Sequence, residues 1–409
     1  MRVLLSALAC EPGKGSEPEV GFRAMLAAAS RHDVWVLTAS ESIPALKQAL
    51  SLDPRADRIH LEDIPFEVPA ERVVHLGAAG YHLRYDRWQR LASSRALALD
   101  REVGFDVAHH VTLASYWTRA GVASLGKPMV WGPIGGGVDP PLRLVPELGP
   151  RGIIEAAARV LARPLIARFP QVRRTQNLAT VTLAQNQGTG RRLRGPGTVI
   201  LLSNALAVQL DGTPAATART GELLYAGRLL PWKAPMLALR ALRYVSHPEA
   251  VLRFCGDGPE EARLRRAARR WGLSGRVRFE GWIQRDRVLA LLARAGALLH
   301  PAVHDEAPLC IAEALTLGTP VVCLDHGGPP EIVGQWPGSP SALVTPRSAE
   351  STARSIAAAV DRFLERPPPT ADRPFAPRTS FEQELLWSYD DALRGHPSRG
   401  QPGPRTKPS

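Results

Sequence analysis

Lysine is scarce in this chain, and so are cysteine and aromatic residues. Only five of its 51 basic residues are lysine, there are four cysteines, and aromatic side chains make up 6% of the sequence. No apolar stretch approaches the roughly 20 residues that span a bilayer, so we predict no transmembrane helix. The cysteines have no spacing typical of a metal site or a redox pair, which favours free thiols in a cytosolic protein.

The formal net charge of +12 raises the question of nucleic-acid binding. The arginines are spread along the whole chain, no recognised nucleic-acid motif accompanies them, and aromatic residues do not interleave with a basic stripe. We therefore expect no nucleic-acid partner. The stretch 151–174 combines apolar residues with several arginines and a single acid, Glu155. It is interpreted either as a solvated helix face or as a surface that rests on anionic lipid.

The first ten residues contain a short apolar run ending in Leu8-Ala9-Cys10, which has some features of a secretory or lipoprotein signal. Arg2 is the only basic residue before the run, and the run is short, so a buried strand over residues 3–6 is the preferred interpretation. We predict a cytoplasmic protein. Peripheral contact with the inner face of a membrane is the alternative that residues 151–174 leave open.

A chain of 409 residues exceeds what one hydrophobic core usually organises, which predicts two domains. Short apolar runs alternate with helical segments in both halves, as in doubly wound α/β folds. Small polar residues over 211–221 indicate a linker between domains 1–205 and 206–365. A helix over 380–393 is expected to pack back on the first domain, and 395–409 to be disordered. Strands are expected at 3–6, 34–38, 107–110, 129–131, 222–226, 251–255, 277–280, 297–300 and 321–324, and helices at 19–30, 259–271 and 308–317.

The clearest chemical signal follows the strand expected at 222–226. Gly227 leads into Arg228, and Lys233 lies in the same loop. Parallel α/β sheets bind ligands at the carboxyl ends of their strands, and a helix N-terminus beside an arginine and a lysine suits a diphosphate. On its own, such a pair on a surface loop is more often structural than functional.

Further motifs follow this loop in a fixed order. They are Phe254-Cys255-Gly256-Asp257-Gly258-Pro259-Glu260, Phe279-Glu280-Gly281-Trp282, His304-Asp305-Glu306-Ala307-Pro308, Glu313-Ala314-Leu315, Gly318-Thr319-Pro320-Val321-Val322 and Gly327-Gly328-Pro329-Pro330-Glu331. In type, order and spacing they resemble the donor half of retaining GT-B glycosyltransferases of family 4, over residues 222 to about 333. The resemblance implies two Rossmann-like domains that face each other across a cleft, with a nucleotide-sugar donor bound to 206–365.

The amino-terminal half resembles the same family at three weaker motifs. Gly13-Lys14-Gly15-Ser16-Glu17 is similar to its glycine-rich loop, and Trp131-Gly132-Pro133-Ile134-Gly135-Gly136-Gly137 to a loop of one bacterial subgroup. Asp106-Val107-Ala108-His109-His110 is similar to its Asp-x-x-His strand end. The resemblance implies that Gly13, Gly15 and Ser16 approach the donor and that His109 or His110 faces the donor sugar. A satisfied core histidine is equally plausible for the histidine that is not used.

The resemblance also implies roles for charged residues of the second half. Arg228 and Lys233 would stabilise the departing nucleoside diphosphate in place of a metal, so we expect no metal and no cofactor besides the donor substrate. Glu313 would take the ribose hydroxyls of the nucleotide. Its partner, eight residues earlier, is Asp305 where the family has glutamate, and Glu306 follows directly. Either acid could orient the donor sugar, and Asp305 is preferred because it keeps the offset.

Several less polar residues complete the implied donor site. Trp282 and Ile283 would contact the base, although simple core packing explains them as well. Gly227, Gly256, Gly258, Pro308 and Leu309 would form the loops around the donor.

The sequence therefore predicts a retaining glycosyltransferase of the hexosyltransferase type (EC 2.4) in bacterial polysaccharide or glycoconjugate biosynthesis. Its acceptor would be a glycan, a lipid-linked molecule or a small molecule. One alternative is a nucleotide-sugar epimerase or hydrolase on the same fold. Another is a non-catalytic module that binds nucleic acid or a lipid surface.

Overall fold

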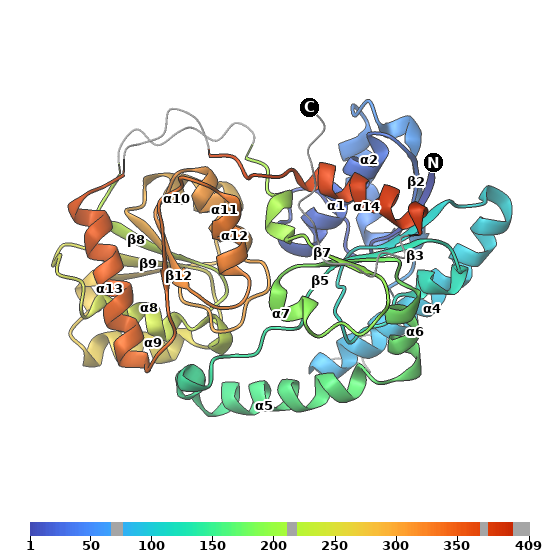
Figure 1. The fold of residues 1–409 in the computed structure, drawn as a ribbon. Coiled ribbons are helices and arrows are strands. Elements are labelled where there is room, and N and C mark those ends of the chain that lie inside the picture. The colour runs from blue at the N-terminus through green and yellow to red at the C-terminus, as the bar shows by residue number, and fades with distance from the viewer. Residues whose placement is uncertain (67–76, 211–218, 369–374, 396–409) are drawn as a thin grey trace.

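The computed structural model describes residues 1–66, 77–210, 219–368 and 375–395. These residues form two lobes, each built around a parallel sheet with helices on both faces (Figure 1). The prediction of two doubly wound α/β domains is confirmed, and every strand expected from the sequence is present. Most of the expected linker and nearly all of the expected disordered tail, residues 396–409, lie outside the described residues.

The amino-terminal sheet has seven strands in the order β3-β2-β1-β4-β5-β6-β7, paired in parallel. Successive side chains of a strand point to opposite faces, so Val3 and Leu5 pack under α1 while Leu4 packs under α4. The strand order reverses beside β1, which places a ligand-binding crevice at the carboxyl ends of β1 and β4. Its elements are β1 (Arg2–Ser6), α1 (Ser16–Ala29), β2 (Asp33–Ala39), α2 (Ile43–Leu50), β3 (Ile59–Ile64), α4 (Gly77–Val103), β4 (Val107–His110), β5 (Met129–Ile134), α5 (Gly149–Ile166), α6 (Pro170–Leu178), β6 (Val181–Ala184), α7 (Gln187–Gly190) and β7 (Thr198–Leu201).

The carboxyl-terminal sheet has six parallel strands in the order β10-β9-β8-β11-β12-β13. β11 and β12 are entirely buried because helices cover both faces of the sheet, which explains their unbroken apolar runs. Its elements are β8 (Glu222–Ala226), α8 (Pro235–Leu242), β9 (Val251–Cys255), α9 (Glu261–Arg270), β10 (Val277–Gly281), α10 (Arg285–Arg294), β11 (Ala297–His300), α11 (Leu309–Thr316), β12 (Val321–Leu324), α12 (Pro329–Gln335), β13 (Ser341–Val344) and α13 (Ala349–Glu365).

The last helix, α14 (Phe381–Arg394), returns to the amino-terminal lobe and lies beside α1 (Figure 1). Its buried Leu385 and Tyr389 join the apolar core under that sheet. The Tyr389 hydroxyl also hydrogen-bonds His109 at 2.8 Å, so the end of the described chain is tied to strand β4.

The segment before α5 packs on the other lobe. Leu144 and Leu148 are buried in the core of the carboxyl-terminal domain, although their position in the chain lies within the expected domain 1–205. Glu147 pairs with Arg240 of α8 at 3.1 Å. From this anchor α5 runs back beneath both lobes to the amino-terminal one (Figure 1).

Candidate active site

A cavity of about 230 Å³ lies between the two domains. Both domains contribute to its wall, and the carboxyl-terminal residues come from the loops that follow β8 and β11, at the carboxyl edge of their sheet. This is the place where open α/β sheets bind ligands. The lining residues are Glu17, Val20, Gln185 and Asn204 from the amino-terminal domain and Trp232, Lys233, His304, Asp305, Glu306, Ala307 and Leu309 from the carboxyl-terminal domain.

Lys233 and Asp305 form an ion pair in the wall of this cavity. His300, at the end of β11, approaches the same carboxylate oxygen with Nε2 at 2.9 Å, while its Nδ1 lies 3.5 Å from the sulfur of Cys310. Burial alone would raise the pKa of Asp305, but the charge of Lys233 and the hydrogen bond from His300 hold that pKa well below its usual range. Asp305 is therefore a carboxylate that keeps Lys233 in one place.

Glu306, the next residue, points to the other domain. Its carboxylate accepts hydrogen bonds from the Asn186 side chain at 2.6 Å, the Thr189 hydroxyl at 2.9 Å and the backbone N–H of Val138 at 3.1 Å. Gly328 packs so closely against the Glu306 carbonyl that a Cβ at that glycine would lie 1.8 Å from the oxygen. Glu306 thus joins the two domains, whereas Asp305 stays within its own.

Glu313 lies on α11 and does not line the cavity. Burial raises the pKa of its carboxyl group, although Arg285 donates a hydrogen bond to it from Nε at 2.9 Å. Pro308 precedes the helix as its N-cap residue, and Leu309 begins the helix in the cavity wall.

Arg228 is exposed beside the cavity loop rather than in the cavity wall. Among the described residues its guanidinium makes no hydrogen bond or ion pair with another side chain, so it is free to meet an anion. The glycines around it are required for space: a Cβ on Gly256 would lie 2.1 Å from the carbonyl oxygen of Gly227, and one on Gly258 would lie 2.5 Å from that of Leu229. Both glycines also have positive φ angles.

His109 and His110 do not face the cavity, which corrects the expectation that one of them meets the donor sugar. Both are completely buried. His109 donates from Nε2 to the carbonyl of Gly132 at 2.7 Å and accepts at Nδ1 from Tyr389. His110 bonds the Tyr85 hydroxyl at 2.8 Å. Burial lowers the pKa of His109 to about 4 and that of His110 to about 3, so both rings are neutral at pH 7.

The glycine-rich loop brings an acid to the cavity that sequence reasoning did not assign. Gly13 and Gly15 have positive φ, and Ser16 begins α1. Glu17 lines the cavity, accepts hydrogen bonds from Leu113 N–H at 2.8 Å and from Asn204 at 3.2 Å, and has its pKa raised by burial.

The two residues expected to contact a base lie apart from the cavity lining. Trp282 is 68% exposed, and Ile283 packs partly against the apolar core. The exposure of the Trp282 indole argues against simple core packing as the explanation for this residue.

Other residues in or next to the cavity wall gave a weaker signal in the sequence. His300 ends a predicted strand, so the rule that ligands bind at strand ends could have found it. Gln185 and Asn204 carry no motif, and only the fold brings them to the cavity. Within the described residues no group of three or more His, Cys, Asp or Glu side chains is arranged to hold a metal ion. None of the described helices combines the length and hydrophobicity that crossing a bilayer requires.

Solved structures that share this architecture define the class of fold. Anabaena Alr3699/HepE in complex with UDP superposes with a TM-score of 0.54 at 16% identity, covering 97% of this chain and 100% of the other. The lipopolysaccharide outer core galactosyltransferase WaaB gives 0.57 at 13% identity, covering 96% and 99%. The protein has the GT-B fold.

The carboxyl-terminal domain is similar to a known family. Residues 216–373 match the model of glycosyl transferases group 1. Glycogen synthase of Mycobacterium tuberculosis is 31% identical over 222 residues, which cover 53% of this chain and 52% of the relative. The 2-deoxystreptamine glucosyltransferase of Streptomyces kanamyceticus is 35% identical over 114 residues, 28% of each chain. The chain thus aligns with about half or less of these curated relatives.

Proposed function

We propose that this protein is a glycosyltransferase that moves a sugar from a nucleotide-diphosphate donor to an acceptor bound on the amino-terminal side of the cavity. The observation that carries the proposal is the Lys233–Asp305 ion pair in a cavity between two GT-B domains. A fixed ammonium group suits the negative charge that develops on a departing diphosphate. The Alr3699/HepE structure with UDP and the similarity of residues 216–373 to glycosyl transferases group 1 support a nucleotide-sugar donor.

The donor would be held by residues of the carboxyl-terminal domain. Lys233 and the free guanidinium of Arg228 would contact the diphosphate. Glu313 would accept hydrogen bonds from the ribose hydroxyls after its hydrogen bond with Arg285 breaks. Trp282 would contact the base, because an exposed indole offers an open face for stacking. No metal or further cofactor is needed in this scheme.

Transfer would proceed with retention of the anomeric configuration by a front-face route. The bond from the anomeric carbon to the diphosphate breaks, and the acceptor oxygen bonds to the same face of that carbon. The acceptor proton passes to the departing phosphate oxygen. Asp305 would orient sugar hydroxyls rather than attack the anomeric carbon, since its carboxylate is held by Lys233 and His300.

A screen of UDP-, GDP-, ADP- and TDP-sugars tests the proposal. Slow release of free sugar from one donor without acceptor is expected, and NMR of a transferred product should give the donor's own anomer. Formation of an epimer would favour the alternative epimerase, and an inverted product would contradict the front-face route.

We also propose that α5 brings the protein to an anionic membrane from the cytoplasmic side. Its outward side carries Ile154, Leu161 and Leu165, which are 69%, 70% and 59% exposed, followed by Phe169 at 59%. Exposed apolar side chains beside arginines suit a lipid interface. Sedimentation with vesicles tests this: recovery should be greater with anionic than with neutral vesicles, and equal recovery at low salt would contradict it.

A further inference from the structure

A second cavity, of about 400 Å³, lies in the amino-terminal domain between the end of α5, α6 and the turn after α7. Of the described residues, the arginines Arg168, Arg173, Arg192 and Arg194 line it, and no aspartate or glutamate does. A shallower hollow of about 480 Å³ shares Arg168 and Arg173 and adds Arg174. We call the two together the arginine cavity.

The neighbouring stretch of sequence supplies no negative charge to these arginines, and of them only Arg192 has an acidic partner among the described residues, Asp139. Residues 156–210 contain eight arginines and neither aspartate nor glutamate. Within the described part of the chain, the guanidinium groups of Arg168, Arg173, Arg174 and Arg194 have no ion pair or hydrogen-bond partner. This contrasts with exposed arginines such as Arg90, Arg95 and Arg265, which pair with nearby acids.

Two of the arginines also lie where the helix dipole disfavours positive charge. Arg173 and Arg174 are the fourth and fifth residues of α6, close to its positive N-terminal end, where an acidic residue would be favourable. Like charges gathered at a helix N-terminus raise the free energy of the empty site. A bound anion removes that cost and gains charge-assisted, bidentate hydrogen bonds.

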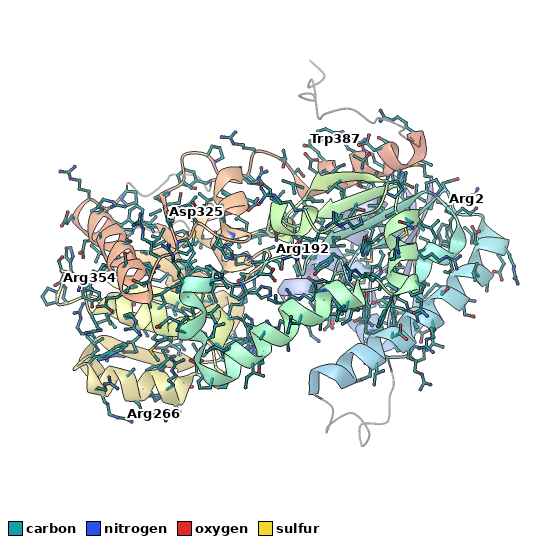
Figure 2. The ribbon with its side chains drawn as sticks, turned by 60° about the horizontal axis from the view of Figure 1, so that its bottom comes forward. Arg2, Arg192, Arg266, Asp325, Arg354 and Trp387 are labelled. Atoms are coloured by element: carbon teal, nitrogen blue, oxygen red, sulfur yellow. The ribbon has the colours of Figure 1, made fainter. Side chains whose placement is uncertain are left out.

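The arginine cavity is connected by a short chain of polar contacts to the cavity between the two domains, which we call the donor cavity after its proposed role. Arg192 pairs with Asp139, whose other oxygen lies 3.9 Å from Arg163. Arg163 in turn reaches Nε2 of His304, a residue in the donor cavity wall, at 3.4 Å. Arg192 lies near the junction of the two lobes (Figure 2). An anion in the arginine cavity therefore sits on the acceptor side of the donor site.

We propose that the arginine cavity binds a phosphate or diphosphate group of the acceptor, so that the enzyme glycosylates a phosphate-bearing molecule. The planar guanidinium group of one arginine can donate hydrogen bonds to two phosphate oxygens at once, and several arginines together suit a group with more than one negative charge. The assignment of the anion to an acceptor rests on the proposed glycosyltransferase function. The binding of the anion does not.

The test compares two double variants of equal charge. Arg173→Gln with Arg194→Gln removes two unpaired arginines of the cavity. Arg266→Gln with Arg270→Gln removes two exposed arginines of α9. Arg266 lies at the outer edge of the carboxyl-terminal lobe (Figure 2). All four side chains are exposed, so neither pair should disturb folding. Both pairs are made in an Arg228→Ala, Lys233→Ala protein, so that the donor site does not take up the probe.

Calorimetry with inorganic pyrophosphate should show binding that weakens at least about tenfold in the cavity variant and changes little in the α9 variant. If both pairs of substitutions weakened pyrophosphate binding equally, net charge alone would explain the effect, and the proposal would be overturned. Failure of the parent protein to bind pyrophosphate would overturn it as well.

Vesicles of phosphatidylcholine with and without phosphatidic acid distinguish a lipid headgroup from a soluble phosphate ester. Binding to phosphatidic acid that pyrophosphate displaces supports a lipid-linked acceptor, and pyrophosphate binding without vesicle binding supports a soluble one. If the parent variant binds pyrophosphate but the wild-type protein cleaves no nucleotide sugar, the result contradicts the proposed transferase alone. If the wild-type protein cleaves a donor but the cavity variant keeps the parent's affinity for pyrophosphate, the result contradicts the anion site alone.

Discussion

The two walls of the donor cavity differ in how they carry charge. The carboxyl-terminal wall presents Lys233 and Asp305, which fix each other as an ion pair. The amino-terminal wall presents Gln185 and Asn204, which are neutral, and Glu17, whose pKa is raised by burial. A reaction that expels an anion needs preorganised charge on the side of the leaving group, while the other side mainly orients its partner. The asymmetry therefore supports the proposed donor and acceptor sides.

Two neighbouring residues show the same division on a smaller scale. Asp305 bonds Lys233 and His300 of its own domain, and Glu306 bonds Asn186 and Thr189 of the other. Asp305 therefore positions the charged groups of the carboxyl-terminal wall, and Glu306 holds the two domains in contact. Substitutions at the two positions should accordingly fail in different ways.

The largest effect is expected from Lys233→Ala, which removes the fixed charge of the carboxyl-terminal wall. Turnover with saturating donor should fall by about 10² or more, the range for loss of one preorganised transition-state partner. Arg228→Ala should act in the same direction. Lys47→Ala, at an exposed lysine of α2, is the matched control and should leave steady-state kinetics unchanged. Near wild-type turnover of Lys233→Ala would show that the leaving group is stabilised elsewhere.

Asp305→Asn should lower turnover about tenfold to a hundredfold and weaken donor binding together with it, because Lys233 loses its partner and the sugar loses an acceptor of hydrogen bonds. Kinetics against donor concentration separate the two parameters. If Glu306→Gln instead abolished turnover while Asp305→Asn stayed active, the sugar-orienting role would move to Glu306.

His109 predicts a pH effect on stability in the amino-terminal domain. Its pKa is lowered to about 4 by burial, so between its ordinary value of 6.5 and that value the unfolded chain binds more protons than the folded one. Folding stability should therefore fall as the pH drops below 6.5, by about 2 kcal/mol at pH 5 for this group alone. His109→Gln cannot titrate, and urea unfolding at pH 7 and pH 5 should show a smaller difference for it than for the wild type. An unchanged difference would mean that His109 is protonated in the folded protein.

The smallest effect is expected from Glu306→Ala, which removes the hydrogen bonds that the buried Asn186 and Thr189 donate across the domain boundary. The closed arrangement should lose about 1 kcal/mol relative to an open one, because water can replace those hydrogen bonds only when the domains separate. Small-angle scattering should give a larger radius of gyration than for the wild type or for Glu41→Ala, an exposed control. A radius identical to that of the wild type would assign the domain contact to other residues.

How much of this site could be predicted depended on whether its residues are local to one motif. The loop with Arg228 and Lys233 and the offset from Asp305 to Glu313 are readable because they follow strands directly. The histidines misled because a strand-end position does not reveal that α14, 280 residues away, supplies Tyr389 to cover His109. The cross-domain partners of Glu306 and the membership of Leu144 in the second core likewise depend on contacts between distant segments.

A titration of nucleotide-diphosphate sugars into the wild-type protein and the Lys233→Ala variant, followed by calorimetry, tests the central claim most directly. We predict that at least one of the UDP-, GDP-, ADP- and TDP-sugars binds the wild type and that the substitution weakens its affinity at least about tenfold, since a charge-assisted contact to the diphosphate is lost. Binding of that donor with equal affinity to both proteins would contradict the placement of the diphosphate at Lys233 in the cavity between the domains.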